Sequence, residues 1–188
     1  MKLTKEWLKE NNPCSDGYKY AVENLLGLDT QEILEKLMSN NKFEWGNWFL
    51  TKLMNKGQCV EYSVFAAENV LGIYEKQYPK DDRPRKAIEA AQKYLANPSA
   101  DAARAADPAA AAAYAAAYAA YDAAAAAARA AAYAAADAAR AAAARAADPS
   151  AAAAAADAAA AAAARADAAN LKTKIINFGL ELINQDYF

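Results

Sequence analysis

The feature that most limits how this chain can fold is an alanine tract at residues 100–170, where 51 of 71 positions are alanine. Alanine is the strongest helix former and loses no rotamer freedom in a helix, so the tract predicts helices along its length. A methyl group buries little surface, however, and contributes far less than the roughly 1.5–3 kcal/mol of a buried leucine or phenylalanine. The tract therefore needs larger side chains to complete a core.

Residues 1–97 can supply those side chains on a series of short amphipathic helices. Asp29, followed by Glu32 three residues later, forms a capping box that predicts a helix start. The clearest period lies in a predicted helix over residues 58–78, where apolar positions alternate steps of four and three. The positions that we expect to face a core there are Val60, Val64, Ala67, Leu71, Tyr74 and Tyr78.

Two further helices are predicted from their side chains. A segment at residues 43–55 is rich in aromatic residues, and we expect Gly57 to end that helix. The chain closes with an ordinary amphipathic helix, whose apolar face we expect to pack back onto the first half. The residues of that face are Leu171, Ile175, Phe178 and Leu182.

Three motifs mark helix starts by placing a capping side chain before a proline: Asn97-Pro98-Ser99, Asp107-Pro108-Ala109 and Asp148-Pro149-Ser150. One helix over residues 108–147 would be about 60 Å long, more than the roughly 40 Å diameter of a compact chain of this size, so a break near Asp122 is an open alternative. Together the patterns predict an all-α fold. A multi-helix bundle would pack an N-terminal helical subregion, residues 1–97, on the alanine-rich helices of residues 98–188 in one compact unit.

The composition argues against several classes of function. The chain has no histidine, which removes imidazole bases, Ser-His and Cys-His nucleophile pairs and most zinc sites. Its net charge of −2 does not suit a generic nucleic-acid-binding protein, and no apolar run has membrane length. Two cysteines are too few for a disulfide framework, and the charged start is unlike a signal segment, so we expect a cytoplasmic location. We expect a non-enzymatic protein without catalytic residues, metal or cofactor.

A tyrosine–arginine strip is the main candidate binding site in the tract. At about 100° per residue, the polar and aromatic side chains between positions 114 and 140 fall within an arc of roughly 160°. This face can pack on the aromatic first half and complete the core. Alternatively it can be a recognition surface, because tyrosine and arginine are enriched at interfaces and can also stack on a base or hold a phosphate. The candidate residues are Tyr118, Tyr121, Arg129, Tyr133 and Arg140.

A basic turn forms a second candidate, an anion site. Lys80, Arg83, Arg85 and Lys86 lie next to Pro84, which suits the first position of the following helix. Backbone N–H groups at a helix start attract anions, and four cations would reinforce them. The alternative is a charged loop that only solvates the turn.

Five segments of the first half form a recognisable set: NPCSDG at residues 12–17, WGNWFL at 45–50, FAAE at 65–68, IYEKQYP at 73–79 and RPRKAIEAA at 83–91. They resemble segments of phage and prophage immunity proteins, and the alanine tract resembles the helical half of the same group. The resemblance implies an all-α, non-enzymatic protein that binds and neutralises another molecule in conflicts between phage, host and competing bacteria. It implies the cytoplasm of a phage-infected or lysogenic bacterium.

Our leading hypothesis is an inhibitor that binds a protein effector, either a toxin or a host defence enzyme. A second hypothesis is a small-molecule sponge that sequesters a nucleotide-type immune signal in a pocket of tyrosine and arginine, at an interface between copies of the chain. A structural or assembly protein without a soluble ligand comes third, and an unrecognised enzyme comes last.

Overall fold

The computed structural model describes residues 1–106, 111, 126–143, 149–163 and 168–185. All the regular secondary structure in these ranges is helical, apart from an isolated β-bridge between Lys2 and Asp29, so the predicted all-α fold is confirmed. Residues 100–106 are helical as well. The labelled helices are α1 (Lys5–Asn11), α2 (Ser15–Asn24), α3 (Thr30–Ser39), α4 (Phe43–Leu53), α5 (Lys56–Gln77), α6 (Arg83–Ala96), α8 (Ala126–Ala143), α9 (Pro149–Ala163) and α10 (Ala168–Asn184).

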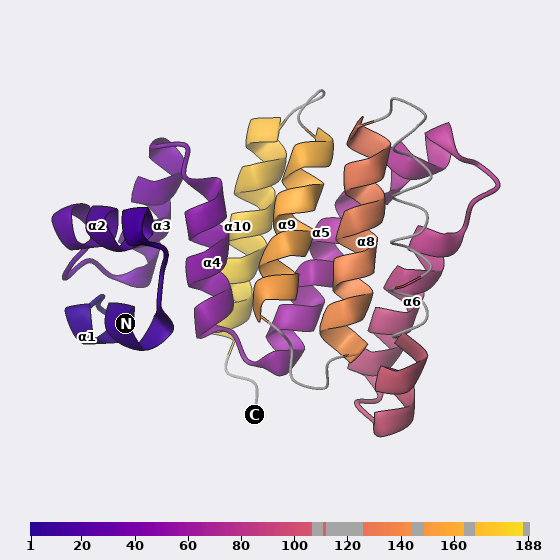
Figure 1. Cartoon of the computed structure of the whole chain (residues 1–188), viewed down its shortest axis with the longest axis horizontal. Coiled ribbons are helices and arrows are strands. Elements are labelled where there is room, and N and C mark those ends of the chain that lie inside the picture. Colours follow the sequence, from indigo (N-terminus) through magenta and orange to yellow (C-terminus); the bar gives the residue numbers. More distant parts are fainter. Residues whose placement is uncertain (107–110, 112–125, 144–148, 164–167, 186–188) are drawn as a thin grey trace.

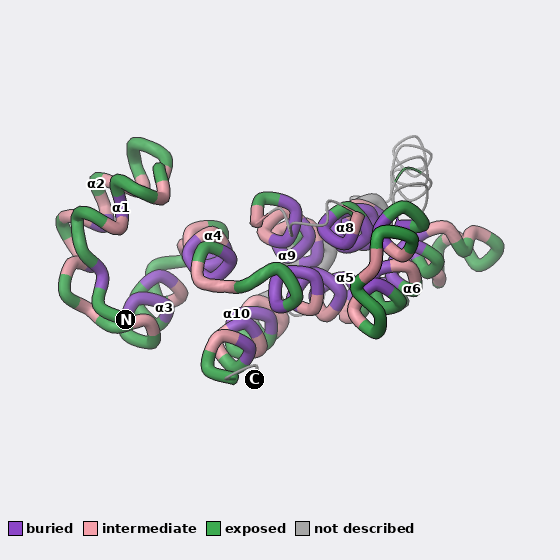
Figure 2. Tube along the Cα trace, turned by 90° about the horizontal axis from the view of Figure 1, so that it is seen from below, coloured by how far each residue is buried: buried purple, intermediate pink, exposed green. Residues whose placement is uncertain are grey.

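Most of these helices stand side by side in two layers (Figure 1). In the view of Figure 2, α4, α9 and α8 form one layer, and α10, α5 and α6 form the other. Helices α1, α2 and α3 lie beyond α4 at one end and form a small lobe. We call α1 to α4 together the N-terminal lobe.

The alanine helices lie inside the bundle. Helix α8 packs against α5, α6 and α9, and α9 also packs against α4 and α5. A helix surrounded on several sides needs small side chains, because only a methyl group then separates neighbouring backbones. The fully buried alanines of α8 are Ala132, Ala134, Ala135, Ala136, Ala138, Ala139, Ala141 and Ala142.

Each layer contains helices from both residues 1–97 and residues 98–188, since α9 packs against α4 in one layer and α10 packs against α5 in the other. The bulk that alanine lacks comes largely from α5. Its predicted seam is buried from Val60 to Tyr74, whereas Tyr78 is half-buried and follows the last residue of α5. Tyr62 and Val70, outside the predicted seam, are completely inaccessible as well. The last helix also packs as predicted, against α4 and α5.

Two predicted helix boundaries are wrong. Gly57 does not end α4 but lies in the first turn of α5, whose start is fixed by a capping box between Asn55 and Gln58. Ser99, rather than Asn97, caps the helix at residues 100–106 by accepting a hydrogen bond from the Ala102 N–H. The motif at 107–109 and the possible break near Asp122 lie outside the described residues, whereas Pro149 does begin α9.

Gly179 of α10 provides a test of the close contact between α10 and the bundle. A Cβ atom added there would lie 2.8 Å from Cε2 of Tyr62 and 2.9 Å from Cδ1 of Leu50, both fully buried. We expect Gly179→Ala to lower the free energy of unfolding by about 1–3 kcal/mol, as overpacking does in a filled core. Urea unfolding followed by circular dichroism measures the change.

The matched control is Gly72→Ala in α5, where an added Cβ meets no atom within 4 Å. There alanine should raise the free energy of unfolding by about 0.5–1 kcal/mol, because it restricts the unfolded chain and favours the helix. Equal effects at both positions would contradict the predicted contact of α10 with Tyr62.

Candidate functional site

The structure separates the residues of the predicted tyrosine–arginine strip. Tyr118 and Tyr121 lie outside the described residues, and of Arg129 the structure describes the helical backbone in α8 but not the side chain. Tyr133 is half-buried and packs against the hydrophobic core, whereas Arg140 is exposed. Of the two described side chains, therefore, one belongs partly to the core and one to the surface.

The predicted anion site is occupied by the chain's own carboxylates. Arg83 donates two hydrogen bonds to Asp81, from Nε at 2.8 Å and from Nη2 at 2.5 Å. This pairing lowers the pKa of Asp81 to about 2. Arg85 makes a similar two-bond pair with Glu75 at 2.6 Å, and Lys86 pairs with Asp82 at 2.9 Å.

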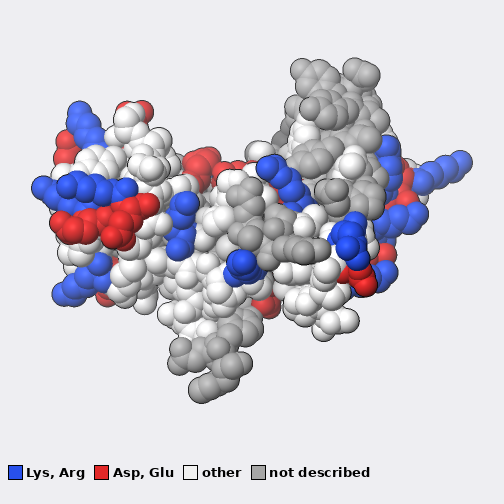
Figure 3. Space-filling view, turned by 60° about the horizontal axis from the view of Figure 1, so that its bottom comes forward, with Lys and Arg blue, Asp and Glu red and all other residues white. Residues whose placement is uncertain are grey.

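Lys80 is exposed, and among the four cations of this turn it alone forms no ion pair with a described residue. An incoming anion would compete with three carboxylates, which favours the interpretation as a charged turn. Figure 3 shows the same mixture of signs more widely, since blue and red side chains lie next to one another at both ends of the molecule.

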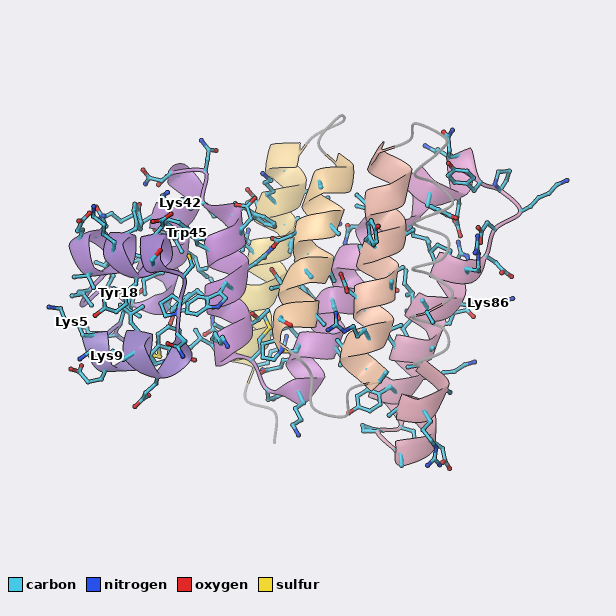
Figure 4. The ribbon with its side chains drawn as sticks, in the orientation of Figure 1. Lys5, Lys9, Tyr18, Lys42, Trp45 and Lys86 are labelled. Atoms are coloured by element: carbon cyan, nitrogen blue, oxygen red, sulfur yellow. The ribbon has the colours of Figure 1, made fainter. Side chains whose placement is uncertain are left out.

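A different surface, which we did not predict, lies on the N-terminal lobe. We call Tyr20, Lys42, Trp45, Trp48 and Lys52 the aromatic–lysine surface. The Lys42 ammonium lies 4.0 Å from the centroid of the Trp45 ring and 4.7 Å from that of Tyr20. Lys52 lies 5.8 Å from the Trp48 ring. Figure 4 shows Lys42 beside Trp45 at the start of α4.

The three rings of this surface are half-buried, so part of each meets solvent. Neither lysine forms an ion pair with any described residue. The sequence did carry a signal, because positions 42, 45, 48 and 52 recur at steps of three and four and share one face of a helix. We noted only that this segment is rich in aromatic residues, and that signal was missed.

An apolar cavity lies within the N-terminal lobe. Its volume is about 270 Å³, and its lining comes from α1 to α4, the segments between them and Leu3, which precedes α1. Trp7 contacts two of the lining rings edge-on. The centroid of its ring lies 5.9 Å from that of Trp48 and 5.4 Å from that of Phe49. The lining residues are Leu3, Leu8, Pro13, Cys14, Gly17, Ala21, Leu25, Ile33, Leu37, Trp45, Trp48 and Phe49.

A buried polar cluster joins the N-terminal lobe to the alanine helices. Asn47 of α4 donates a hydrogen bond to Oδ1 of Asp157 in α9 at 2.6 Å, and it accepts one from the Tyr62 hydroxyl of α5 at 2.5 Å. Burial raises the pKa of Asp157 to about 6, with a further contribution from Glu44. Burial also raises the pKa of Tyr62. The cluster links three helices, with Asn47 and Tyr62 buried and Asp157 half-buried.

The described part of the chain has neither the side-chain grouping of a metal site nor a membrane-spanning helix. Within it, no three side chains of the histidine, cysteine and carboxylate types are grouped so that they could hold a metal ion. None of the helices in these ranges has both the length and the apolar character needed to cross a membrane.

Comparison with known proteins gives one match. The model of the Imm-5 like putative immunity protein family matches residues 50–142, from the end of α4 through α5 and α6 into α8. No curated protein sequence and no solved structure matches the chain. Over residues 50–142 the chain is thus similar to the Imm-5 like putative immunity proteins, which confirms the resemblance to immunity proteins seen in its sequence.

Proposed function

We propose that this chain is a non-enzymatic immunity protein that neutralises a protein effector by binding it directly. The family match supports an immunity-type role, and proteins of that type act on a partner. The observation that carries the proposal is the aromatic–lysine surface, where Lys42 lies over two half-buried rings and pairs with no described carboxylate.

The chemistry of this surface suits a protein partner. Tryptophan and tyrosine are enriched among the interface residues that dominate binding, because they bury a large rigid area at low entropic cost. Lys42 and Lys52 can each meet a carboxylate at the rim of such an interface. A nucleotide partner finds less support, since the arginines of the basic turn are already paired and no charged side chain lines the apolar cavity.

The test begins with tagged protein purified from the bacterium that produces it and examined by native mass spectrometry. We expect one stoichiometric protein partner to be recovered. Lys42→Glu should then weaken that complex at least about tenfold in calorimetric titration, because it puts a negative charge where the surface would meet a carboxylate of the partner. Lys93→Glu makes the same charge change on an exposed position of α6 and should leave the affinity unchanged.

Recovery of a small molecule of nucleotide mass would support a sponge, and recovery of the bare chain would support a structural protein. Either result would contradict the proposed function. A protein partner whose affinity responds equally to both substitutions would retain the function but exclude this surface as the interface.

A further inference from the structure

We infer that the apolar cavity of the N-terminal lobe is a binding site for one uncharged aromatic molecule of about the size of indole. This inference concerns a small ligand and does not rest on the proposed function. All residues that line the cavity lie at positions 3–49, before the segment that matches the immunity family.

The size and depth of the cavity are the first support for this inference. A cavity of roughly 150 Å³ lined by leucine, isoleucine and phenylalanine is large enough to bind benzene. The volume of about 270 Å³ found here leaves room for a second fused ring. Several lining side chains are almost completely buried, such as Leu8, Ile33 and Leu37, so the space is a deep apolar pocket, and it opens to solvent beside the exposed Cys14.

The lining selects the chemistry of the ligand. It combines aliphatic side chains with the aromatic rings of Trp45, Trp48 and Phe49 and contains no charged side chain. A charged ligand would lose its hydration without gaining a partner, whereas a neutral ring can make edge-on and offset contacts with the walls. Because Trp7 already holds Trp48 and Phe49 in place, binding need not order those two walls.

The cavity opens to solvent at the start of α2, where an exposed cysteine can report on ligand binding. Pro13 and Gly17 are half-buried lining residues, and the lining residue Cys14 between them is exposed. The other cysteine, Cys59, is buried in α5. A thiol reagent therefore reports on the mouth of the cavity through Cys14 in the folded protein.

The experiment is a calorimetric titration of the full chain with indole. We expect one site per chain with a dissociation constant on the order of 0.1–1 mM, as suits a ligand of about nine non-hydrogen atoms. Saturating indole should also slow the reaction of Cys14 with a thiol reagent severalfold. Indole-2-carboxylate, which adds a charge to the same rings, should bind at least about tenfold more weakly.

A matched pair of variants locates the site. Ala21→Leu adds three carbon atoms from a buried lining position and should abolish indole binding, while Ala96→Leu adds the same atoms at an exposed position of α6 and should not. Circular dichroism checks that both variants are folded. If Ala21→Leu does not fold, attaching a benzyl group to Cys14 of the folded wild-type protein blocks the same space and should prevent binding.

The inference is overturned if indole does not bind at millimolar concentration, as for a cavity that takes only a side chain of a protein partner. It is also overturned if indole binding survives both ways of filling the cavity. The proposed function is tested separately, through Lys42 and the recovered complex.

Discussion

Asn47→Ala should lower the free energy of unfolding by about 2–5 kcal/mol, because it leaves the buried Tyr62 hydroxyl and the half-buried Asp157 carboxyl without their partner. Asn47 is completely inaccessible, and its amide bridges the Asp157 carboxylate and the Tyr62 hydroxyl. Each group left unsatisfied in the interior costs about 1–3 kcal/mol. Urea unfolding at pH 7, followed by circular dichroism, measures the loss.

The control for this substitution is Asn24→Ala in α2. The Asn24 amide donates to the carbonyl of Tyr20 within the same helix, so its removal breaks a local bond and separates no elements. We expect a loss of at most about 1 kcal/mol there. If the two variants were equally stable, the bridge between α4, α5 and α9 would not exist in solution.

Local signals allowed much of the fold to be predicted. The capping box at Asp29 and Glu32 lies where we expected it, since both of its hydrogen bonds depend on residues three positions apart. The seam of α5 and the apolar face of α10 also follow from spacing alone. Such features belong to one helix, and a single helix can be recognised from its own sequence.

The packing of the alanine helices could not be predicted in the same way. An all-alanine surface looks alike from every direction, so the sequence does not state which face of α8 or α9 meets which neighbour. The contact that fixes α9 joins Asn47 to a residue 110 positions away. Asp157 is one of seven aspartates in the tract, and nothing near it in the sequence distinguishes it from the others.

The aromatic–lysine surface was not predicted for a related reason. Tyrosine and arginine stood out against the alanines of the tract, whereas the tryptophans of α4 lay in a segment where aromatic side chains are expected in a core. Phe43 and Leu50 are indeed buried, but Trp45 and Trp48 are displaced around the helix and are only half-buried. Exposure of a large ring depends on whether another helix covers that face, which local sequence does not state.

The raised pKa of Asp157 predicts that the protein loses stability as the pH rises. Its carboxyl group titrates at about 6 in the folded chain, against an ordinary value of 3.8. The neutral form therefore favours folding, fully below pH 4, and this advantage is lost as the pH rises through 6. A difference of about two pKa units corresponds to at most about 3 kcal/mol, because each unit is worth about 1.4 kcal/mol.

The groups around Asp157 shift its pKa in opposite directions. Glu44 raises the pKa, while the Asn47 hydrogen bond and Lys172 lower it, and burial outweighs both. Asp81, by contrast, has a pKa lowered to about 2, so its pairing adds stability that is lost only below about pH 4. Between pH 5 and 8, therefore, the free energy of unfolding changes with the titration of Asp157 but not with that of Asp81.

Asp157→Asn should remove most of this pH dependence, because an asparagine keeps the Oδ1 acceptor for Asn47 and cannot ionise. At pH 8 we expect the variant to exceed the wild type in the free energy of unfolding by up to about 3 kcal/mol, with a difference that shrinks towards pH 5. Asp16→Asn, at an exposed position of α2, should produce no such trend. A constant difference between Asp157→Asn and wild type from pH 5 to pH 8 would mean that Asp157 is solvated, and that α9 does not lie against α4 as described.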